Sequence, residues 1–352
     1  MEILPLDRSD DAVLEQLWRS SVRSDRASRV SFVCESLVEA TQEARYSYPG
    51  TRDEAVVAVV DGQVVGGGRI WLPGRDNVTL SWAGLHVDPD HRRRGIGSAL
   101  LEALEARAVA AGRVSLLTDA FVPPGARAEH PVRRFARARG YEVYSVEIVR
   151  ELALPMPGSL LDRLESSARP AWSRDYDVVV HRNGVPEPLR PSLCAAMNRL
   201  DLDAPTGDVT FEEETLDPDG YADHLAHESR LGRERLTAVA VHRHTGEVVA
   251  YTDLAIPAGD PDVVLQLGTL VVPEHRGHRL GTAVKVANLR ALAAAFPQRS
   301  RVQTMNAEDN PWMVAINERL GFRIVEEALQ LRRVLPAATP SAGASRHTVG
   351  AC

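Results

Sequence analysis

Apolar positions along the first half of the chain switch between two periods, and the order of these runs predicts a regular series of elements. Val- and Leu-rich runs that alternate with polar residues indicate strands, whereas Ala/Leu-rich stretches with a period near 3.6 indicate helices. Asp61-Gly62, between two apolar runs, predicts a hairpin turn. The expected strands are 2–6, 55–60, 63–71, 78–87, 113–120 and 141–154, and the expected helices are 10–24, 32–45, 95–111 and 131–139.

The second half shows the same order of patterns. Thr245-Gly246 takes the place of the first hairpin turn. The expected strands are 177–181, 236–241, 248–256, 263–272, 301–306 and 322–334, and the expected helices are 191–200, 221–231, one that follows the turn at 275–281 and ends near 295, and 311–320.

The two halves also match residue by residue. A shift of 184 positions superimposes about three dozen residues without a gap, as in Gly62 and Gly246, Pro73 and Pro257, and His91 and His275. A period this long indicates a duplicated domain, because solenoid repeats span roughly 20–50 residues. We therefore expect an N-terminal domain at 1–154, a linker at 155–174, a C-terminal domain at 175–335 and a disordered tail at 336–352.

Composition narrows the class of protein. A chain of 352 residues with 44% hydrophobic residues suits two packed domains. The net charge of −7 argues against a general nucleic-acid binder. The three cysteines, Cys34, Cys194 and Cys352, are far apart, which predicts no disulfide framework and no metal site and favours the cytoplasm. The expected protein has no signal peptide or membrane span, and is a monomer or a homodimer.

A basic, glycine-containing turn occurs once in each half, between an expected strand and an expected helix. These turns are Arg92-Arg93-Arg94-Gly95-Ile96-Gly97 and Arg276-Gly277-His278-Arg279-Leu280-Gly281. A helix start offers unbonded N–H groups and a favourable dipole to a phosphate. The turns therefore predict a phosphate-bearing ligand, and the alternative is a solvated basic turn that only caps a helix.

The loops, the strands before them and the Gly-aromatic pairs Gly140-Tyr141 and Gly321-Phe322 together resemble the GNAT (Gcn5-related N-acetyltransferase) family. The chain looks like a tandem GNAT protein over residues 1 to about 335. The resemblance implies an α/β (α+β) fold of two consecutive GNAT domains, each a mixed, mostly antiparallel twisted sheet with flanking helices. The first loop matches the family pattern fully, whereas Arg279 replaces the middle glycine of the second loop.

The resemblance implies acetyl-CoA as co-substrate and assigns it a set of residues. In the first half these are Leu85, His86, Val87, Arg92, Arg93, Arg94, Gly95, Ile96, Gly97 and Ser98. In the second half they are Val271, Arg276, Gly277, His278, Arg279, Leu280, Gly281 and Asn310.

The residues that would move protons are harder to assign. The family's usual tyrosine acid, four residues before the Gly-aromatic pair, is replaced by Ala136 and Asn317. The candidates are His86, Asp253 and Glu308, each with a structural alternative: a half-buried strand histidine, strand polarity and a helix-start charge. We expect Tyr251 to serve in packing.

The function expected from the resemblance is N-acetyl transfer from acetyl-CoA to a primary amine of a small molecule, by direct attack in a ternary complex. The missing tyrosines favour an alternative, a non-catalytic acyl-CoA-binding module. An aminoacyl-tRNA donor is a further alternative, because Arg133, Arg134, Arg137 and Arg139 follow one expected helix, which also reads as a solvated face. Which half is active stays open at this stage.

Overall fold

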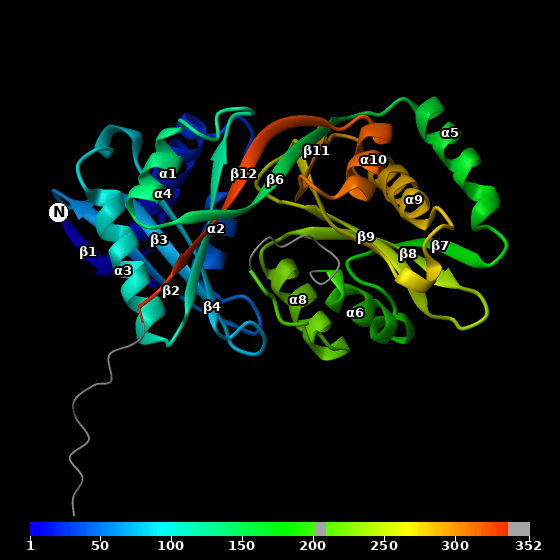
Figure 1. Cartoon of the computed structure of the whole chain (residues 1–352), viewed down its shortest axis with the longest axis horizontal. Coiled ribbons are helices and arrows are strands. Elements are labelled where there is room, and N and C mark those ends of the chain that lie inside the picture. Colours follow the sequence, from blue (N-terminus) through cyan, green and yellow to red (C-terminus); the bar gives the residue numbers. More distant parts are fainter. Residues whose placement is uncertain (201–208, 337–352) are drawn as a thin grey trace, which may run out of the picture.

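A single twelve-stranded sheet runs through the whole chain in the computed structural model, which describes residues 1–200 and 209–336. The strand order is β1-β2-β3-β4-β5-β12-β6-β11-β10-β9-β8-β7. Neighbouring strands are antiparallel except for β4 with β5 and β10 with β11. Figure 1 shows the two halves side by side, joined by the long strands β6 and β12.

The strands have the following bounds: β1 Glu2–Pro5, β2 Thr51–Val60, β3 Gln63–Pro73, β4 Leu80–Val87, β5 Ser115–Val122, β6 Glu142–Ala153, β7 Tyr176–Arg182, β8 Glu234–His242, β9 Val248–Ile256, β10 Val263–Val271, β11 Arg301–Ala307 and β12 Arg323–Val334. The helices are α1 Asp11–Ser28, α2 Leu37–Arg45, α3 Ile96–Ala110, α4 Pro131–Ala138, α5 Gly158–Ala168, α6 Arg190–Asn198, α8 Pro218–Arg230, α9 Leu280–Ala295 and α10 Pro311–Leu320.

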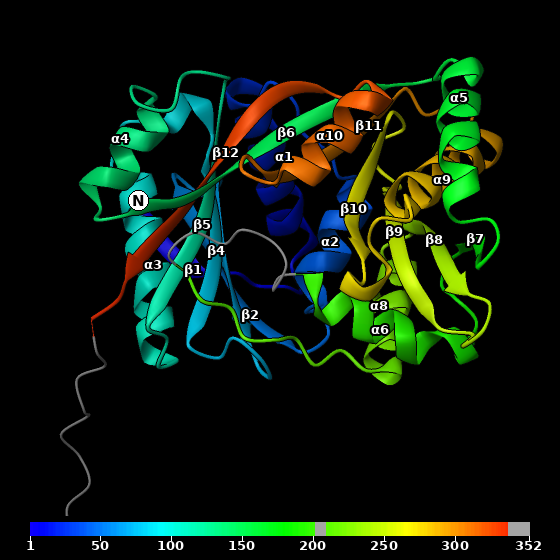
Figure 2. The ribbon, with the colours of Figure 1, turned by 45° about the vertical axis from the view of Figure 1, so that its right-hand side comes forward.

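The final strand of each half crosses into the other half. β12 pairs with β5 of the first half along Ser115–Val122, and β6 pairs with β11 of the second half along Arg301–Ala307. β6 and β12 also pair with each other in the middle of the sheet. The exchange joins two halves of similar fold into one sheet (Figure 2).

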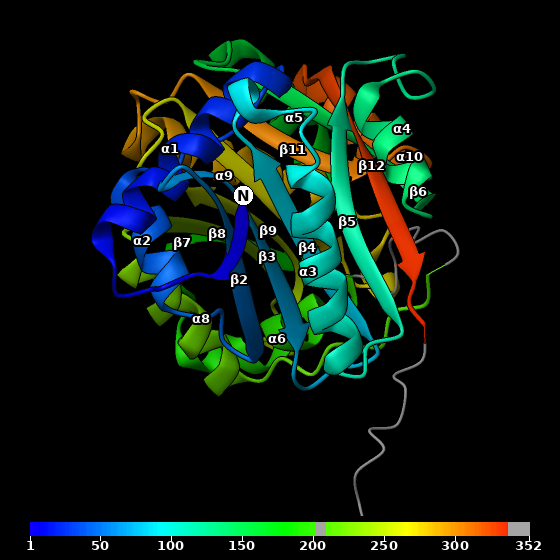
Figure 3. The same cartoon turned by 90° about the vertical axis from the view of Figure 1, so that its left-hand side faces the viewer.

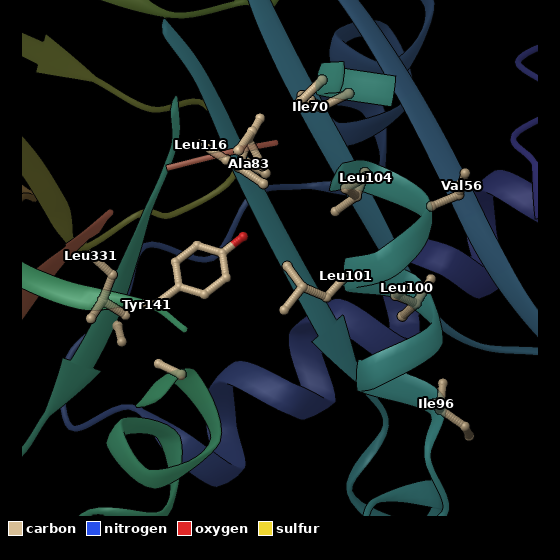
Figure 4. Packing of buried hydrophobic residues seen from close by; sticks show 14 of the residues in the cluster. Val56, Ile70, Ala83, Ile96, Leu100, Leu101, Leu104, Leu116, Tyr141 and Leu331 are labelled. Atoms are coloured by element: carbon tan, nitrogen blue, oxygen red, sulfur yellow. The ribbon is translucent and has the colours of Figure 1, made fainter. Parts of the chain in front are cut away.

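The exchanged strands also complete the cores on both sides. Leu329 and Leu331 of β12 pack in the core of the first half, and Leu152 of β6 packs in a core of the second half. Figure 4 shows Leu331 beside Tyr141, near the α3 residue Leu101. Neither half therefore has a complete core without the other.

Helices cover both faces of the sheet. On β3, a Cβ at Gly67 would meet Leu17 of α1, and a Cβ at Gly68 would meet Leu104 of α3. Successive strand residues face opposite sides of the sheet, so α1 and α3 lie on opposite faces. The second half repeats this, with Ala250 packing against α9 and Tyr251 against α6. Figure 3 shows α3 running along the sheet of the first half.

The structure confirms the expected fold class and corrects some element boundaries. α2 begins at Leu37 and not at 32, because Ser36 and Glu39 form a capping box that fixes its start. Residues 158–168 of the expected linker form α5, which packs on α9 through the ion pair of Arg290 with Asp162. The expected disordered tail lies, apart from Pro336, outside the described residues.

The described part of the chain contains neither a candidate membrane span nor a candidate metal centre. Within it, no helix combines the length and apolar character needed to cross a membrane. Among the same residues, no group of three or more His, Cys, Asp or Glu side chains is placed to hold a metal ion.

The strand exchange predicts that the two halves unfold together. Leu331, 2% exposed, packs in the first-half core although it belongs to the last strand of the chain. Leu331→Ala should lower the free energy of unfolding by about 2–5 kcal/mol and shift one shared calorimetric transition. Val334→Ala on the same strand is the control, because Val334 is 61% exposed and its truncation should change stability by less than about 0.5 kcal/mol. Two separate transitions, of which L331A moved one, would contradict the shared fold.

Candidate active site

Each half contains a pair of parallel strands that pair at one end and continue separately. β4 pairs with β5 at Leu80–Trp82, and then continues to Val87 along β3. β10 pairs with β11 at Val263–Gln266 in the same way, and continues to Val271 along β9. The parallel register of the first pair stops at Trp82, so one edge of residues 83–87, including Leu85 and His86, faces the gap that opens toward β5.

The loop after β4 presents the start of α3 without a side-chain cap. Arg93 and Gly95 have left-handed φ angles of 64° and 84°. The space around Gly95 is open, since a Cβ there would meet no heavy atom within 4 Å. The N–H groups of the first helical turn, including those near Gly97 and Ser98, are therefore available to an anion.

The second loop has left-handed residues at the same two positions, but its glycine stands at the first of them and not at the second. Gly277 and Arg279 adopt left-handed φ angles of 85° and 55° and correspond to Arg93 and Gly95. Arg279 is thus accommodated at the helix start, where its guanidinium donates to the backbone oxygen of Ser167 (3.1 Å). His278 lies within 3.2 Å of the oxygen of His275 in the same loop.

The arginines of the first loop have different tasks. Arg92 donates to the backbone oxygen of Val87 (3.1 Å) and to the hydroxyls of Ser24 and Ser28 (2.9 Å each), so it ties the loop to α1. Arg93 and Arg94 are exposed, and Arg94 donates to the backbone oxygen of Asp90. Arg276 repeats the first contact of Arg92, with the backbone oxygen of Val271 (3.2 Å).

A cavity of about 750 Å³ lies between α1, α2 and strands β3 and β4 of the first half, and residues of the second half close it. Leu85 and His86 of β4 line the cavity, as do Gly67 and Gly68 of β3. The second-half wall comprises Glu228, Arg233, Arg235, Ala255, Pro257, Leu265 and Leu267. The cavity therefore adjoins β4, the strand that leads into the first basic loop.

The corresponding region of the second half is filled by side chains. The strand registers place Tyr251 opposite Leu270 where the first half has Gly67 opposite His86. Tyr251, 1% exposed, packs with Leu193, Tyr221 and Leu270. The expected packing role of Tyr251 is confirmed, and it explains why the two halves differ in the space they offer.

His86 is held inside the first half. Its Nε2 lies 2.8 Å from the hydroxyl of Ser20 on α1. Burial lowers the pKa of His86 to about 4, so the imidazole is neutral at physiological pH. His86 can then orient a neighbouring group by hydrogen bonding, but it is a weak proton acceptor at neutral pH.

A cluster of carboxylates surrounds Arg233, a second-half residue of the cavity wall. Arg233 contacts Glu35 (2.9 Å), Glu43 (2.9 Å) and Glu39 (3.4 Å). Glu39 also accepts from the backbone N–H groups of Ala258 and Gly259, which fixes α2 against the second half.

The environment of Glu35 changes its acidity. Burial, together with the charge of Glu43, raises the pKa of Glu35 to about 7, although Arg233 and Arg69 act in the opposite direction. A carboxylate with this pKa accepts and releases a proton near neutral pH, as a general base must. Glu35 can therefore act as a proton acceptor in the cavity wall.

Two of the expected catalytic residues lie outside the residues that line the cavity. Asp253 is buried on β9, where it accepts from the hydroxyl of Thr237 (2.5 Å) and pairs with Arg235 (3.4 Å). Glu308 pairs with Arg127 of the first half (2.8 Å), and that arginine lowers the pKa of Glu308. Both therefore have structural partners away from His86.

Asn310 and the arginine-rich helix also have local roles. The side chain of Asn310 accepts from the N–H of Met313 and so caps α10. Arg139, which follows α4, pairs with Glu102 of α3 (2.6 Å).

Sequence reasoning did not select Glu35, Glu43 or Arg233. The Ser36-x-x-Glu39 capping box was a readable signal for the start of α2, and it places Glu35 in the loop just before the helix. No local pattern marks Arg233, because its partner Glu35 is 198 residues away.

Comparisons with known proteins identify acetyltransferases as similar to this chain. The model of the acetyltransferase (GNAT) family matches residues 21–141. A mycothiol acetyltransferase from Frankia casuarinae is 37% identical over 95 residues, which are 27% of this chain and 26% of that protein. The match thus spans about a quarter of the length of that relative.

Solved structures match over the whole chain. A tandem GNAT protein from the clavulanic acid biosynthesis pathway is 27% identical to this chain and superimposes with a TM-score of 0.79. The match covers 96% of this chain and 99% of that protein. A GCN5-related N-acetyltransferase from Sphaerobacter thermophilus has a TM-score of 0.63 with 96% of both chains covered. Its identity of 14% shows a common fold alone.

Proposed function

We propose that this chain, a tandem protein of the GNAT acetyltransferase family, transfers an acetyl group from acetyl-CoA to the primary amine of a small molecule at one site in its first half. The observation that carries the proposal is the 750 Å³ cavity beside β4, whose counterpart in the second half is packed around Tyr251. Acceptor and donor would meet there in a ternary complex.

The residues present in the first half fit acetyl-CoA. Its pyrophosphate needs several N–H donors close together, and the uncapped start of α3 with open space at Gly95 offers them. Arg93 and Arg94, both exposed, would pair with outer phosphate oxygens. The edge of β4 beyond Trp82, up to Leu85, would hydrogen-bond the pantetheine arm, next to the Val87 oxygen that accepts from Arg92. When bound, acetyl-CoA supplies the thioester carbonyl and a thiol that leaves as the C–N bond forms.

Glu35 would prepare the acceptor. A primary amine arrives as an ammonium ion at neutral pH, and it must lose a proton before its nitrogen can attack. Glu35, with its pKa near 7, takes this proton within the cavity and passes it to solvent. Neutral His86, fixed by Ser20, orients the reacting group from β4.

The second half would support this site without a reaction of its own. Asn317, at the position of the family's tyrosine, is buried and bonded to Lys285 (3.2 Å) and Asn306 (3.1 Å). Arg150 of β6 joins the same network through Asn306. This network favours a second half that is non-catalytic and structural.

The donor site can be tested by a matched pair of substitutions. Gly95→Asp places a carboxylate at the start of α3, where phosphate is expected, and aspartate tolerates a left-handed φ. We expect acetyl-CoA affinity measured by calorimetry to fall at least tenfold because of charge repulsion, or ~1.4 kcal/mol.

The control is Arg279→Asp, at the corresponding left-handed position of the second loop. Its affinity for acetyl-CoA should stay within about twofold of the parent. Loss of affinity in R279D with normal binding by G95D would place the donor in the second half instead.

The role of Glu35 predicts opposite pH shifts in two variants. The rate of CoA thiol release should rise with pH as Glu35 loses its proton, with a midpoint near pH 7. Glu43→Gln removes a like charge, so the midpoint should fall by about one pH unit; Arg233→Leu removes the opposite charge, so it should rise by a similar amount. Glu35→Gln should remove this limb and lower the rate about 100-fold. Parallel profiles for all four proteins would exclude Glu35 as the base.

A further inference from the structure

The charge of the cavity wall identifies the chemical class of the acceptor. We propose that the acceptor is a cationic amine with an apolar body and no carboxylate or phosphate group. This inference rests on the proposed function, because it concerns the acceptor cavity of the same reaction. It is carried by the contacts of the charged residues in the wall and by the apolar surface between them.

Every arginine of the wall is already engaged by a carboxylate. Arg69 pairs with Asp53 (2.8 Å), Arg233 with Glu35 and Glu43, and Arg235 with Asp253 (3.4 Å). An anionic acceptor would have to displace one of these carboxylates to gain an arginine partner. Asp53 and Asp253 are buried, and leaving a buried carboxylate without its arginine is costly, so the exchange at Arg69 or Arg235 is unfavourable.

Carboxylates are in excess around the cavity. The wall contains five of them, Asp25, Glu35, Glu43, Asp53 and Glu228, against three arginines. Behind the wall both signs occur: Glu39 and Asp253 add carboxylates, and Arg8, Arg29 and Arg92 add guanidiniums, so the excess of carboxylates belongs to the wall itself. The surplus negative charge is balanced either by protons or by a cation that enters the cavity.

Asp25 and Glu35 are the carboxylates best placed to receive such a cation. Burial raises the pKa of Asp25, and its neighbours Arg29 and Arg92 are bonded elsewhere, to Glu326 (2.8 Å) and to the serines of α1. Glu35 shares its only close guanidinium among the described residues, Arg233, with three other glutamates, Glu39, Glu43 and Glu228. An ammonium group could pair with either carboxylate without breaking an existing strong contact.

The remainder of the wall is apolar and aromatic. Trp18, Phe32, Tyr48 and Trp71 line the cavity together with Leu14 and Leu17. Aromatic faces attract ammonium groups as well as hydrocarbon. The volume of about 750 Å³ is that of ordinary small-molecule sites, about 300–1,000 Å³. A compact amine with a hydrocarbon or aromatic body meets all of these conditions.

Pairs of compounds that differ by one carboxylate test the proposal. Tryptamine with tryptophan, and phenethylamine with phenylalanine, share the apolar body and the amine. We expect CoA thiol release at pH 8 to give at least 100-fold higher kcat/KM for the decarboxylated member of each pair, because like charges across a binding surface are strongly unfavourable. Asp25→Asn should narrow this preference about tenfold, while Val334→Ala on the exposed end of β12 should leave it unchanged. Equal or better turnover of the amino acids would overturn the proposal.

Direct binding separates this inference from the proposed reaction. With the full chain saturated with CoA, calorimetry should show tryptamine binding at least tenfold more tightly than tryptophan or the uncharged N-acetyltryptamine. Absence of turnover with every amine, combined with this binding order, would contradict the reaction and support the acceptor class. Tighter binding of tryptophan or of N-acetyltryptamine would contradict the acceptor class, whatever the turnover.

Discussion

The structure depends on the exchange of β6 and β12, the last strands of the two halves. Each strand completes the sheet and the core of the other half, so the two domains share one framework. Ion pairs follow the exchanged strands, as between Arg29 and Glu326 and between Arg127 and Glu327. Because of this framework, the loop before β8 is held against α2, where Arg233 meets the glutamates of the first half. The cavity is therefore a property of the joined pair.

Duplication has produced two halves with a similar backbone and different side chains beside the sheet. Both keep the separated parallel strands and the left-handed loop at the start of a helix. The replacement of Gly67 by Tyr251 and of His86 by Leu270 fills in the second half the space that is open in the first. The second half instead supplies a wall and a guanidinium. In our account it has become a partner that shapes the acceptor site, while Arg233 counteracts the rise in the pKa of Glu35.

The sequence predicted the elements, the duplication and the fold class well, because hydrophobic periodicity and turn residues are local signals. The same signals do not distinguish the pairing of β5 with β6 from its pairing with β12, since the two strands are equivalent copies and both satisfy the pattern. The task of Arg92, which ties its loop to α1, also needs tertiary contacts with Ser24 and Ser28. Glu35 and Arg233 escaped notice because burial and long-range contact, and not a motif, give them their properties.

The central claim is that one half reacts while the other supports it. A crystal structure of the full chain with acetyl-CoA tests this most directly, because it shows which groove holds the thioester. Our account predicts the acetyl group beside Leu85–Val87 of β4, facing the cavity that contains Glu35. An acetyl group bound between β10 and β11, with the groove beside β4 empty, would contradict it.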